Sequence, residues 1–279
     1  MVAALIVRKP NNSILYDTSK AAYGLIKAGP VVAAGQWNRL DPNKGNKPSY
    51  FADDIYKFEV ENAVSPIVFV YGKSGKPFQS MEGNKQVFYF AGPVSGIQVY
   101  CFDLMRPIFT GPALKTRGED GGLTFNSLQF PLNVKGTSTP PPVKYFDNGT
   151  LWPFTGGTNP PDWPMLPAGG NGSRAGIFST RIRVPLDASK KYAAHIPWNR
   201  GVEWVGYLSG VGTDRWRGGG EEGCYGEDGA VAHIIWASPE TSFASVHTTT
   251  RFGWFNMQND LRPACSYIEL SEYPYPFNT

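Results

Sequence analysis

The stretch ALKTRGEDGGLTFNS, residues 113–127, has the pattern of two short strands joined by a turn. Nearly the same pattern comes earlier, as ALIVRKPNNSILYDT at residues 4–18, and the two align without a gap at an offset of 109 residues, from 4 to 113. In both copies an arginine ends the first strand and an aliphatic–x–aromatic triplet opens the second, so its two apolar side chains share one sheet face. Asp-Gly at 120–121 is a strong hairpin signal, and Pro-Asn-Asn at 10–12 is a compatible turn. The alignment predicts two related hairpins, and hence one β-unit that begins near residue 1 and another that begins near residue 112.

Glycine and proline punctuate the whole chain, whose 279 residues include 32 Gly and 24 Pro beside an aromatic content of 14%. Gly permits positive φ and Pro removes a backbone donor, so both interrupt regular elements with turns. Between these turns lie short segments rich in β-branched and aromatic residues: 55–60, 66–71, 86–90, 97–102, 122–130, 177–184, 202–208, 230–236, 242–247 and 266–270. Such spacing is typical of sandwiches and jelly rolls. We therefore predict an all-β fold with two jelly-roll-like β-sandwich units, residues 1–111 and 112–279.

Three segments depart from this strand pattern. Residues 18–29, TSKAAYGLIKAG, have the best helical periodicity, but Gly24 inside them makes an extended strand equally favoured. Residues 135–175 are dominated by Pro and Gly yet carry five aromatic residues, which predicts a packed, extended insertion in the second unit. Residues 213–229, TDRWRGGGEEGCYGEDG, are rich in Gly and in acidic residues, which predicts a second ornate loop.

The charge and apolar patterns argue against several classes of partner. The net charge is +3 and no run of Lys and Arg reaches five residues, so we expect no nucleic-acid partner. No apolar stretch approaches the ~20 residues of a membrane span, so we expect no membrane insertion. The start, MVAALIVRKP, lacks the charged-then-apolar order of a signal peptide, which predicts synthesis in a cytoplasm. Cys101, Cys224 and Cys265 are too few for a disulfide scaffold and are typical of reduced structural thiols.

Sequence motifs for enzymatic chemistry are missing. The chain has no G-x-S-x-G elbow and no phosphate-binding G-x-x-x-x-G-K-[ST], and its Gly-rich WRGGGEEGCYGEDG is too acidic to bind phosphate. The three histidines, His195, His233 and His247, and the cysteines show no paired ligands at the short spacing usual for zinc. We therefore expect no catalytic residue, no metal and no cofactor. A catalytic pair such as Cys224 with His247 is the weaker alternative to structural thiols.

Two carbohydrate-directed functions stand as alternatives. A glycosidase needs only two carboxylates about 5–10 Å apart. Asp162 in PPDWP and Glu203 in VEWVG lie beside tryptophans, as the acids of sugar sites often do. One alternative is therefore a polysaccharide-degrading glycosidase or depolymerase that uses Asp162 or Glu203, and the other is a free carbohydrate-binding module.

The repeated motif also carries a family resemblance. An aliphatic strand, a turn, and then SILYDTS followed by YGL resembles the start of small minor tail proteins of long-tailed bacteriophages. GGLTFNSLQFPLNV at 121–134 is similar to a second copy of this theme, and VYCFDLMRP at 99–107 is similar to the strand ending in Phe-Asp that precedes it. The resemblance covers about the first half of the chain. It implies a virion component of the tail tip or baseplate with a β-sandwich fold and no catalytic residues.

These observations together predict a non-enzymatic structural protein of a phage tail, located in the virion after synthesis in the host cytoplasm. Its expected partners are copies of itself and neighbouring tail-tip subunits, assembled with cyclic symmetry, with a host surface glycan as a further partner. Aromatic side chains in the long loops would stack on sugar rings or contact the neighbouring subunit. The candidate residues for these contacts are Trp152, Phe154, Trp163 and Trp216.

Overall fold

The computed structural model describes residues 6–12, 14–17, 20–45, 47–91, 96–158, 179–207, 215–236, 243–246 and 253–278. Over these residues the chain is all-β, as predicted, with two short 3-10 turns, η1 (Pro42–Lys44) and η2 (Leu270–Glu272), and no α-helix. A helix long and apolar enough to cross a membrane is accordingly not found in this part of the chain.

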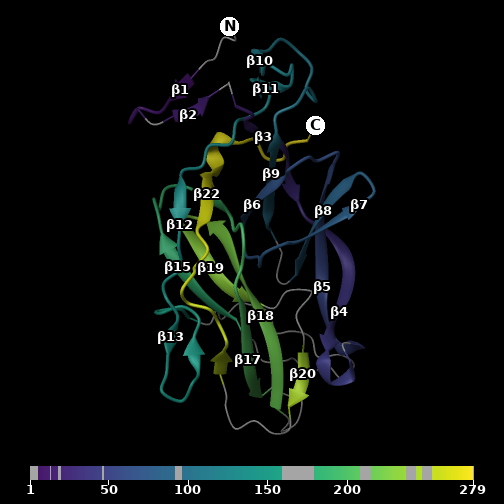
Figure 1. Ribbon diagram of the computed structural model, residues 1–279, viewed down its shortest axis with the longest axis vertical. Helices are drawn as coiled ribbons and strands as arrows, with labels where there is room; N and C mark the ends of the chain where they lie inside the picture. The colour runs from purple at the N-terminus through teal and green to yellow at the C-terminus, as the bar shows by residue number, and fades with distance from the viewer. Residues whose placement is uncertain are drawn as a thin grey trace.

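The strands are short in most places, as the spacing of turn signals predicts (Figure 1). In chain order they are β1 (Ile6–Arg8), β2 (Ile14–Asp17), β3 (Tyr23–Pro30), β4 (Val32–Asp41), β5 (Lys47–Glu61), β6 (Ile67–Tyr71), β7 (Phe78–Glu82), β8 (Lys85–Ala91), β9 (Gln98–Leu104), β10 (Lys115–Arg117), β11 (Leu123–Asn126), β12 (Gly136–Ser138), β13 (Lys144–Tyr145), β14 (Leu151–Trp152), β15 (Thr180–Pro185), β16 (Tyr192–His195), β17 (Gly201–Tyr207), β18 (Arg215–Glu227), β19 (Ala230–Trp236), β20 (Phe243–Val246), β21 (Gly253–Phe255) and β22 (Cys265–Glu269).

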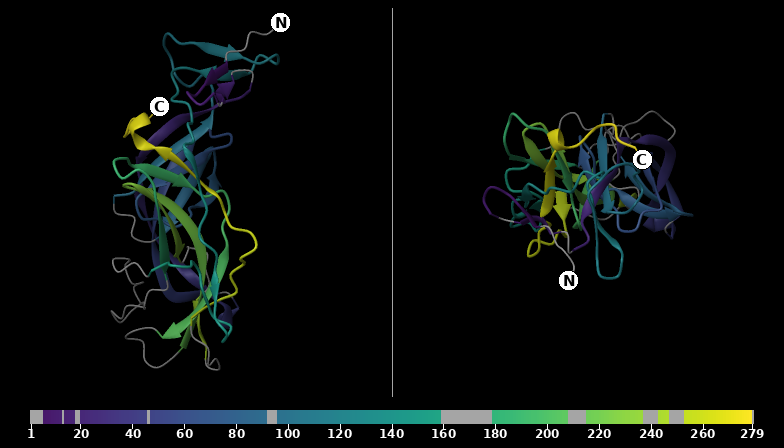
Figure 2. Two further views of the ribbon diagram at one scale, coloured as in Figure 1. Left: turned by 90° about the vertical axis from the view of Figure 1, so that its left-hand side faces the viewer. Right: turned by 90° about the horizontal axis from the view of Figure 1, so that it is seen from above.

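Within the described residues these strands form one large sheet, one small sheet and two separate hairpins. The large sheet has 14 strands, with the order β12-β22-β16-β6-β18-β17-β21-β14-β13 along its path and β3, β9, β15, β19 and β20 attached beside it. The small sheet has the order β4-β5-β8-β7. Figure 2 shows the small sheet lying alongside the curved large sheet along the length of the molecule.

The main core lies between the two sheets. Phe58 of β5 and Phe88 of β8 belong to the same apolar cluster as Val70 of β6 and Ile234 of β19, and all four are buried. Alternation along β5 explains this placement, because Phe58 and Val60 face the core while Glu59 between them does not. The opposite face of the small sheet is covered by its own cluster around Ile55, Val87 and Tyr89.

Strands from both sides of residue 111 share the large sheet. Tyr71 of β6 pairs with Gly226 of β18, and Val70 pairs with Ala194 of β16. The main cluster likewise contains residues from both halves of the chain. The boundary between 111 and 112 therefore does not divide the molecule into two separately closed sandwiches, because the C-terminal strands complete a sheet that the N-terminal strands begin.

Two ambiguous or loop-like segments turn out to be strands. Residues 23–29 of the stretch that was equally compatible with helix and strand belong to β3, which ends at Pro30 and pairs with β9. Residues 215–227, expected to be an ornate loop, form β18 at the centre of the large sheet, so that expectation was wrong. Gly223 of β18 is needed for close approach rather than for a turn, since a Cβ there would lie 2.8 Å from the backbone nitrogen of Lys76.

Candidate interaction surface at the paired hairpins

The two predicted hairpins form, and they have the same register. In the first, Ile6 pairs with Asp17, Val7 with Tyr16 and Arg8 with Ile14, with a shift between Val7 and Arg8. In the second, the same offset of 109 residues relates every pair: Lys115 with Asn126, Thr116 with Phe125, and Arg117 with Leu123, with the shift between Thr116 and Arg117. The repetition in the sequence is therefore a repetition of one backbone geometry.

The turns are equivalent as well. Arg8 donates from Nη1 to the carbonyl of Asn12 at 2.9 Å, and Arg117 donates from Nη1 to the carbonyl of Gly121 at 2.8 Å. Asn12 and Gly121 both have positive φ, 65° and 79°, which only Gly, Asn and Asp adopt readily. The arginine that ends each first strand thus holds the left-handed residue of its own turn.

The hairpins lie outside the large sheet at one end of the molecule, where both views place them together (Figure 1, Figure 2). Isolated two-stranded hairpins are marginally stable in water, so each needs further contacts. The second hairpin is tied to the start of β3 by the hydrogen bond from Ala22 N to Thr124 O. The first reaches the segment after the second through Lys9, whose ammonium donates to Val134 O at 3.4 Å.

Large apolar side chains are exposed at this hairpin end. Ile6 and Ile14 of the first hairpin are 47% and 51% exposed, and Leu114, which precedes the second, is 52% exposed. Ile108 and Phe130, from the segments flanking the second hairpin, are also exposed. Ile14 also lines a cavity of about 590 Å³ between the first hairpin and residues 131–134. These exposed apolar side chains favour a protein contact surface at this end of the molecule.

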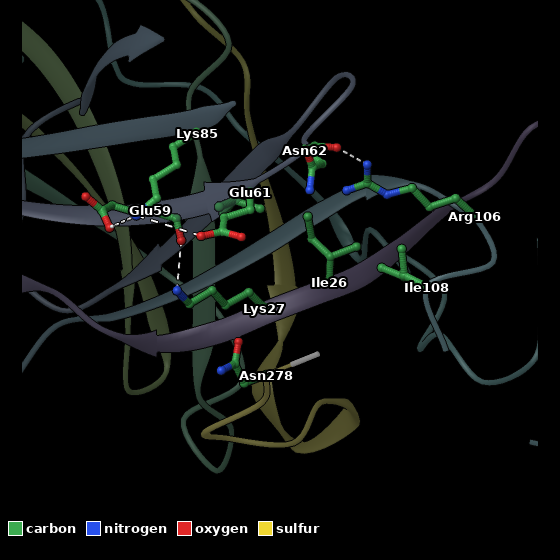
Figure 3. Close-up of a pocket in the computed structure, with 10 residues that line it drawn as sticks. Ile26, Lys27, Glu59, Glu61, Asn62, Lys85, Arg106, Ile108 and Asn278 are labelled. Carbon is green, nitrogen blue, oxygen red and sulfur yellow. Dashed lines mark hydrogen bonds and ion pairs between the residues drawn. The ribbon is translucent and has the colours of Figure 1, made fainter. Parts of the chain in front are cut away.

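A second cavity, of about 400 Å³, is lined by charged side chains (Figure 3). Its charges are matched within the protein: Lys85 lies 3.5 Å from a carboxylate oxygen of Glu59, and Arg106 lies 3.2 Å from Asp103. The hydrogen bond from Lys57 lowers the pKa of Glu59, and the charges of Lys57 and Lys85 act in the same direction. The general acid of a glycosidase needs a raised pKa, so Glu59 is unsuited to that role.

The four aromatic candidates have separate locations. Phe154 is fully buried in the main core, which corrects its assignment as a contact residue, because the Leu-Trp-Pro-Phe stretch folds inward at β14. Trp152 is half-buried against the same core and donates from Nε1 to the carbonyl of Gly157 at 3.0 Å. Trp163 lies outside the described residues. Trp216 stands in β18 rather than in a loop, and its side chain is not among those described.

Of the two acids considered for the glycosidase alternative, the structure describes only Glu203. Asp162 lies outside the described residues. Glu203 accepts a hydrogen bond at 2.7 Å from Arg217 and another at 3.0 Å from Asn256. A carboxylate held by a guanidinium and an amide has the surroundings of a surface ion pair.

The structure brings together three possible metal ligands that do not form a short motif in the sequence. Cys224, His233 and Cys265 are all buried, and their ligand atoms lie within 4.8 Å of one another. They come from three different strands, so no short motif could reveal them. His247, the partner considered for Cys224, lies outside the described residues.

Burial of His195 and His233 makes stability depend on pH. Burial lowers the pKa of His195 despite its hydrogen bond to Val68 O, and lowers the pKa of His233 to about 3. In the unfolded chain each histidine takes up a proton below its ordinary pKa of about 6.5, whereas in the folded chain it stays neutral. The free energy of unfolding therefore falls by up to about 1.4 kcal/mol per pH unit for each histidine as the pH drops below that value. We expect urea unfolding at pH 7.5 and 5.5 to show lower stability at pH 5.5. His195→Gln should reduce this dependence, and an unchanged slope would contradict the assignment.

Comparison with known proteins gives no relative. A scan against protein-family models finds no match for this chain, and searches of the curated proteins and of the solved structures find none.

Proposed function

We propose that this protein is a non-enzymatic structural component of a phage tail tip or baseplate, and that its hairpin end contacts a neighbouring subunit of that assembly. The observation that carries the proposal is the duplicated hairpin, which repeats its register and its arginine-held turn and has exposed aliphatic side chains at Ile6, Ile14 and Leu114. This is also the motif on which the resemblance to minor tail proteins rests. In this role the protein belongs to the virion after synthesis in the host cytoplasm.

The physical basis of the proposed contact is the apolar surface that is exposed to water at the hairpin end. Each hairpin is a two-stranded sheet outside the large sheet; the first leaves Ile6 and Ile14 in water, and Leu114, directly before the second, is exposed as well. Burying Ile6, Ile14 and Leu114 against another subunit would stabilise the assembly at about 25 cal/mol per Å² of apolar surface removed from water. A second copy of this chain or an adjacent tail-tip protein supplies such a surface in a symmetric ring.

Host attachment is the second part of the proposal. The aromatic residues that stay candidates for it are Trp152, Trp163 and Trp216, of which Trp152 presents only part of its ring. A tail protein that stacks these rings on a surface glycan would bind host cells, whereas the hairpin end would bind tail subunits. The two contacts would therefore be separable by mutation.

Leu114→Lys should remove the protein from virions without unfolding it. Leu114 is 52% exposed, and its backbone is held by the hydrogen bond from Ser127 N to Leu114 O. A charge at this position changes the free energy of unfolding by no more than about 0.5 kcal/mol, as is usual at the surface. At a subunit contact the same charge must be desolvated without a partner. Quantitative mass spectrometry of purified virions measures the loss.

Leu261→Lys is the matched control, because Leu261 is 62% exposed and lies between β21 and β22. It should leave incorporation unchanged. Absence of the wild-type chain from virions would overturn the proposed function. Normal incorporation of Leu114→Lys would instead remove the hairpin end from it. Release of reducing ends from host glycans, abolished by Asp162→Asn, would favour the depolymerase.

A further inference from the structure

We infer that Cys224, His233 and Cys265 form a buried binding site for a thiophilic divalent cation of the zinc class. Cys224 and His233 are cross-strand partners on β18 and β19. Cys265 is on β22, opposite Ser138 of β12. Two strand pairs thus bring two thiols and an imidazole to one point, with their ligand atoms within 4.8 Å of one another.

The distance between Cys265 and His233 suits a shared metal ion. Cys265 Sγ lies 3.6 Å from His233 Nδ1. Tetrahedral zinc with bonds of about 2.3 Å to sulfur and about 2.0–2.1 Å to nitrogen places those two atoms about 3.5–3.6 Å apart. Three protein ligands leave a fourth position for water, as in other zinc sites with three protein ligands.

The surroundings orient the imidazole. Ser138 Oγ lies 2.8 Å from Nε2 of His233 and is itself buried. When Nε2 donates its proton to Ser138, the lone pair of Nδ1 points towards the cysteines. Fixing the ligand tautomer through the other ring nitrogen is the usual second contact of a metal-binding histidine.

Charge balance favours a divalent ion in this apolar place. The site is walled by Ala194, Ile196 and Val231, so an uncompensated charge would be costly. Binding displaces both thiol protons to solvent, and two thiolates with a neutral imidazole offset the charge of a divalent cation. Arg200, whose charge acts on His233, is itself paired with Glu222. The complex is therefore neutral in surroundings where an unpaired charge would be costly.

Cobalt(II) titration of protein freed of metal by a chelator under reducing conditions tests the site. We expect one equivalent to produce thiolate-to-cobalt charge-transfer absorption and tetrahedral d–d bands, and one equivalent of zinc to bleach them. Cys224→Ala and Cys265→Ala should each lose most of the charge-transfer absorption. Cys101→Ala is the matched control, because Cys101 is equally buried but lies in the main core.

If the variants fail to fold, measurements on the wild-type protein alone still test the site. Zinc should raise its unfolding midpoint, since an ion that binds only the folded state stabilises it. Folded wild-type protein with neither cobalt bands nor a midpoint shift overturns the site. Bands that persist in a folded double variant lacking Cys224 and Cys265 overturn it too. Isolation under reducing conditions with these cysteines joined as a disulfide also overturns it.

Discussion

Gly226→Ala is expected to prevent folding, or to lower the free energy of unfolding by roughly 3 kcal/mol or more. A Cβ at this position would lie 1.9 Å from the carbonyl oxygen of Tyr192 and 2.6 Å from the Cα of Ala193. Both are backbone atoms of β16, so no side-chain rotation relieves the overlap. The same glycine pairs with Tyr71, and its carbonyl accepts from Gly72 N at 2.9 Å. Moving β18 away from β16 would therefore break its contact with β6.

Gly201→Ala is the matched control, because Gly201 begins β17 and a Cβ there meets nothing within 4 Å. It should leave stability unchanged or raise it slightly, since alanine restricts the unfolded chain more than glycine does. Urea unfolding followed by tryptophan fluorescence measures both variants. A Gly226→Ala protein with wild-type stability would show that β16 and β18 do not cross as closely as described.

The two hairpins could be predicted because their register and turns depend on signals that are local in the sequence. A positive-φ residue, an arginine at a fixed position and an aliphatic–x–aromatic triplet all lie within fifteen residues, and together they specify register and turn. Most strands could be predicted for the same reason, since alternation and turn residues act over a few positions.

Long-range pairing could not be predicted in this way. Nothing in residues 66–71 indicates that β6 pairs with β18, more than 140 residues later, so the division at 111–112 followed from the repeat and missed the shared sheet. The glycines of β18 were assigned to a loop because a turn and a close backbone approach both require glycine. Only the neighbouring strand distinguishes the two uses.

The candidate sites show the same limit. Phe154 was grouped with Trp152 because both are aromatic residues among prolines, yet only its neighbours in space decide that it is buried. Cys224, His233 and Cys265 were read as unrelated because zinc ligands usually come in closely spaced pairs. Here strand pairing replaces sequence spacing: the β18–β19 register joins Cys224 to His233, and the packing of β22 adds Cys265.

Glu222→Gln is the second change with a large expected effect, a loss of about 3–5 kcal/mol. Glu222 lies in the acidic, Gly-rich stretch for which the sequence predicts a loop, but it is fully buried and accepts two hydrogen bonds from Arg200, at 2.7 and 3.0 Å. Arg200 also donates to Gln258 O at 2.9 Å. Burial raises the pKa of Glu222, and the bonds from Arg200 oppose that shift. Glutamine keeps the shape but leaves the guanidinium as an unpaired charge in the interior.

Two further variants test whether the unpaired charge of Arg200 causes this loss of stability. Glu203→Gln breaks an ion pair with Arg217 whose arginine is 58% exposed, so it should cost no more than about 1 kcal/mol. The double replacement of Arg200 and Glu222 by methionine should recover much of the loss, because it removes both charges from the interior. Chemical unfolding of the three variants measures these differences. If Glu222→Gln costs no more than Glu203→Gln, water must reach the Arg200 guanidinium, and the buried pair is not what joins β18 to the start of β17.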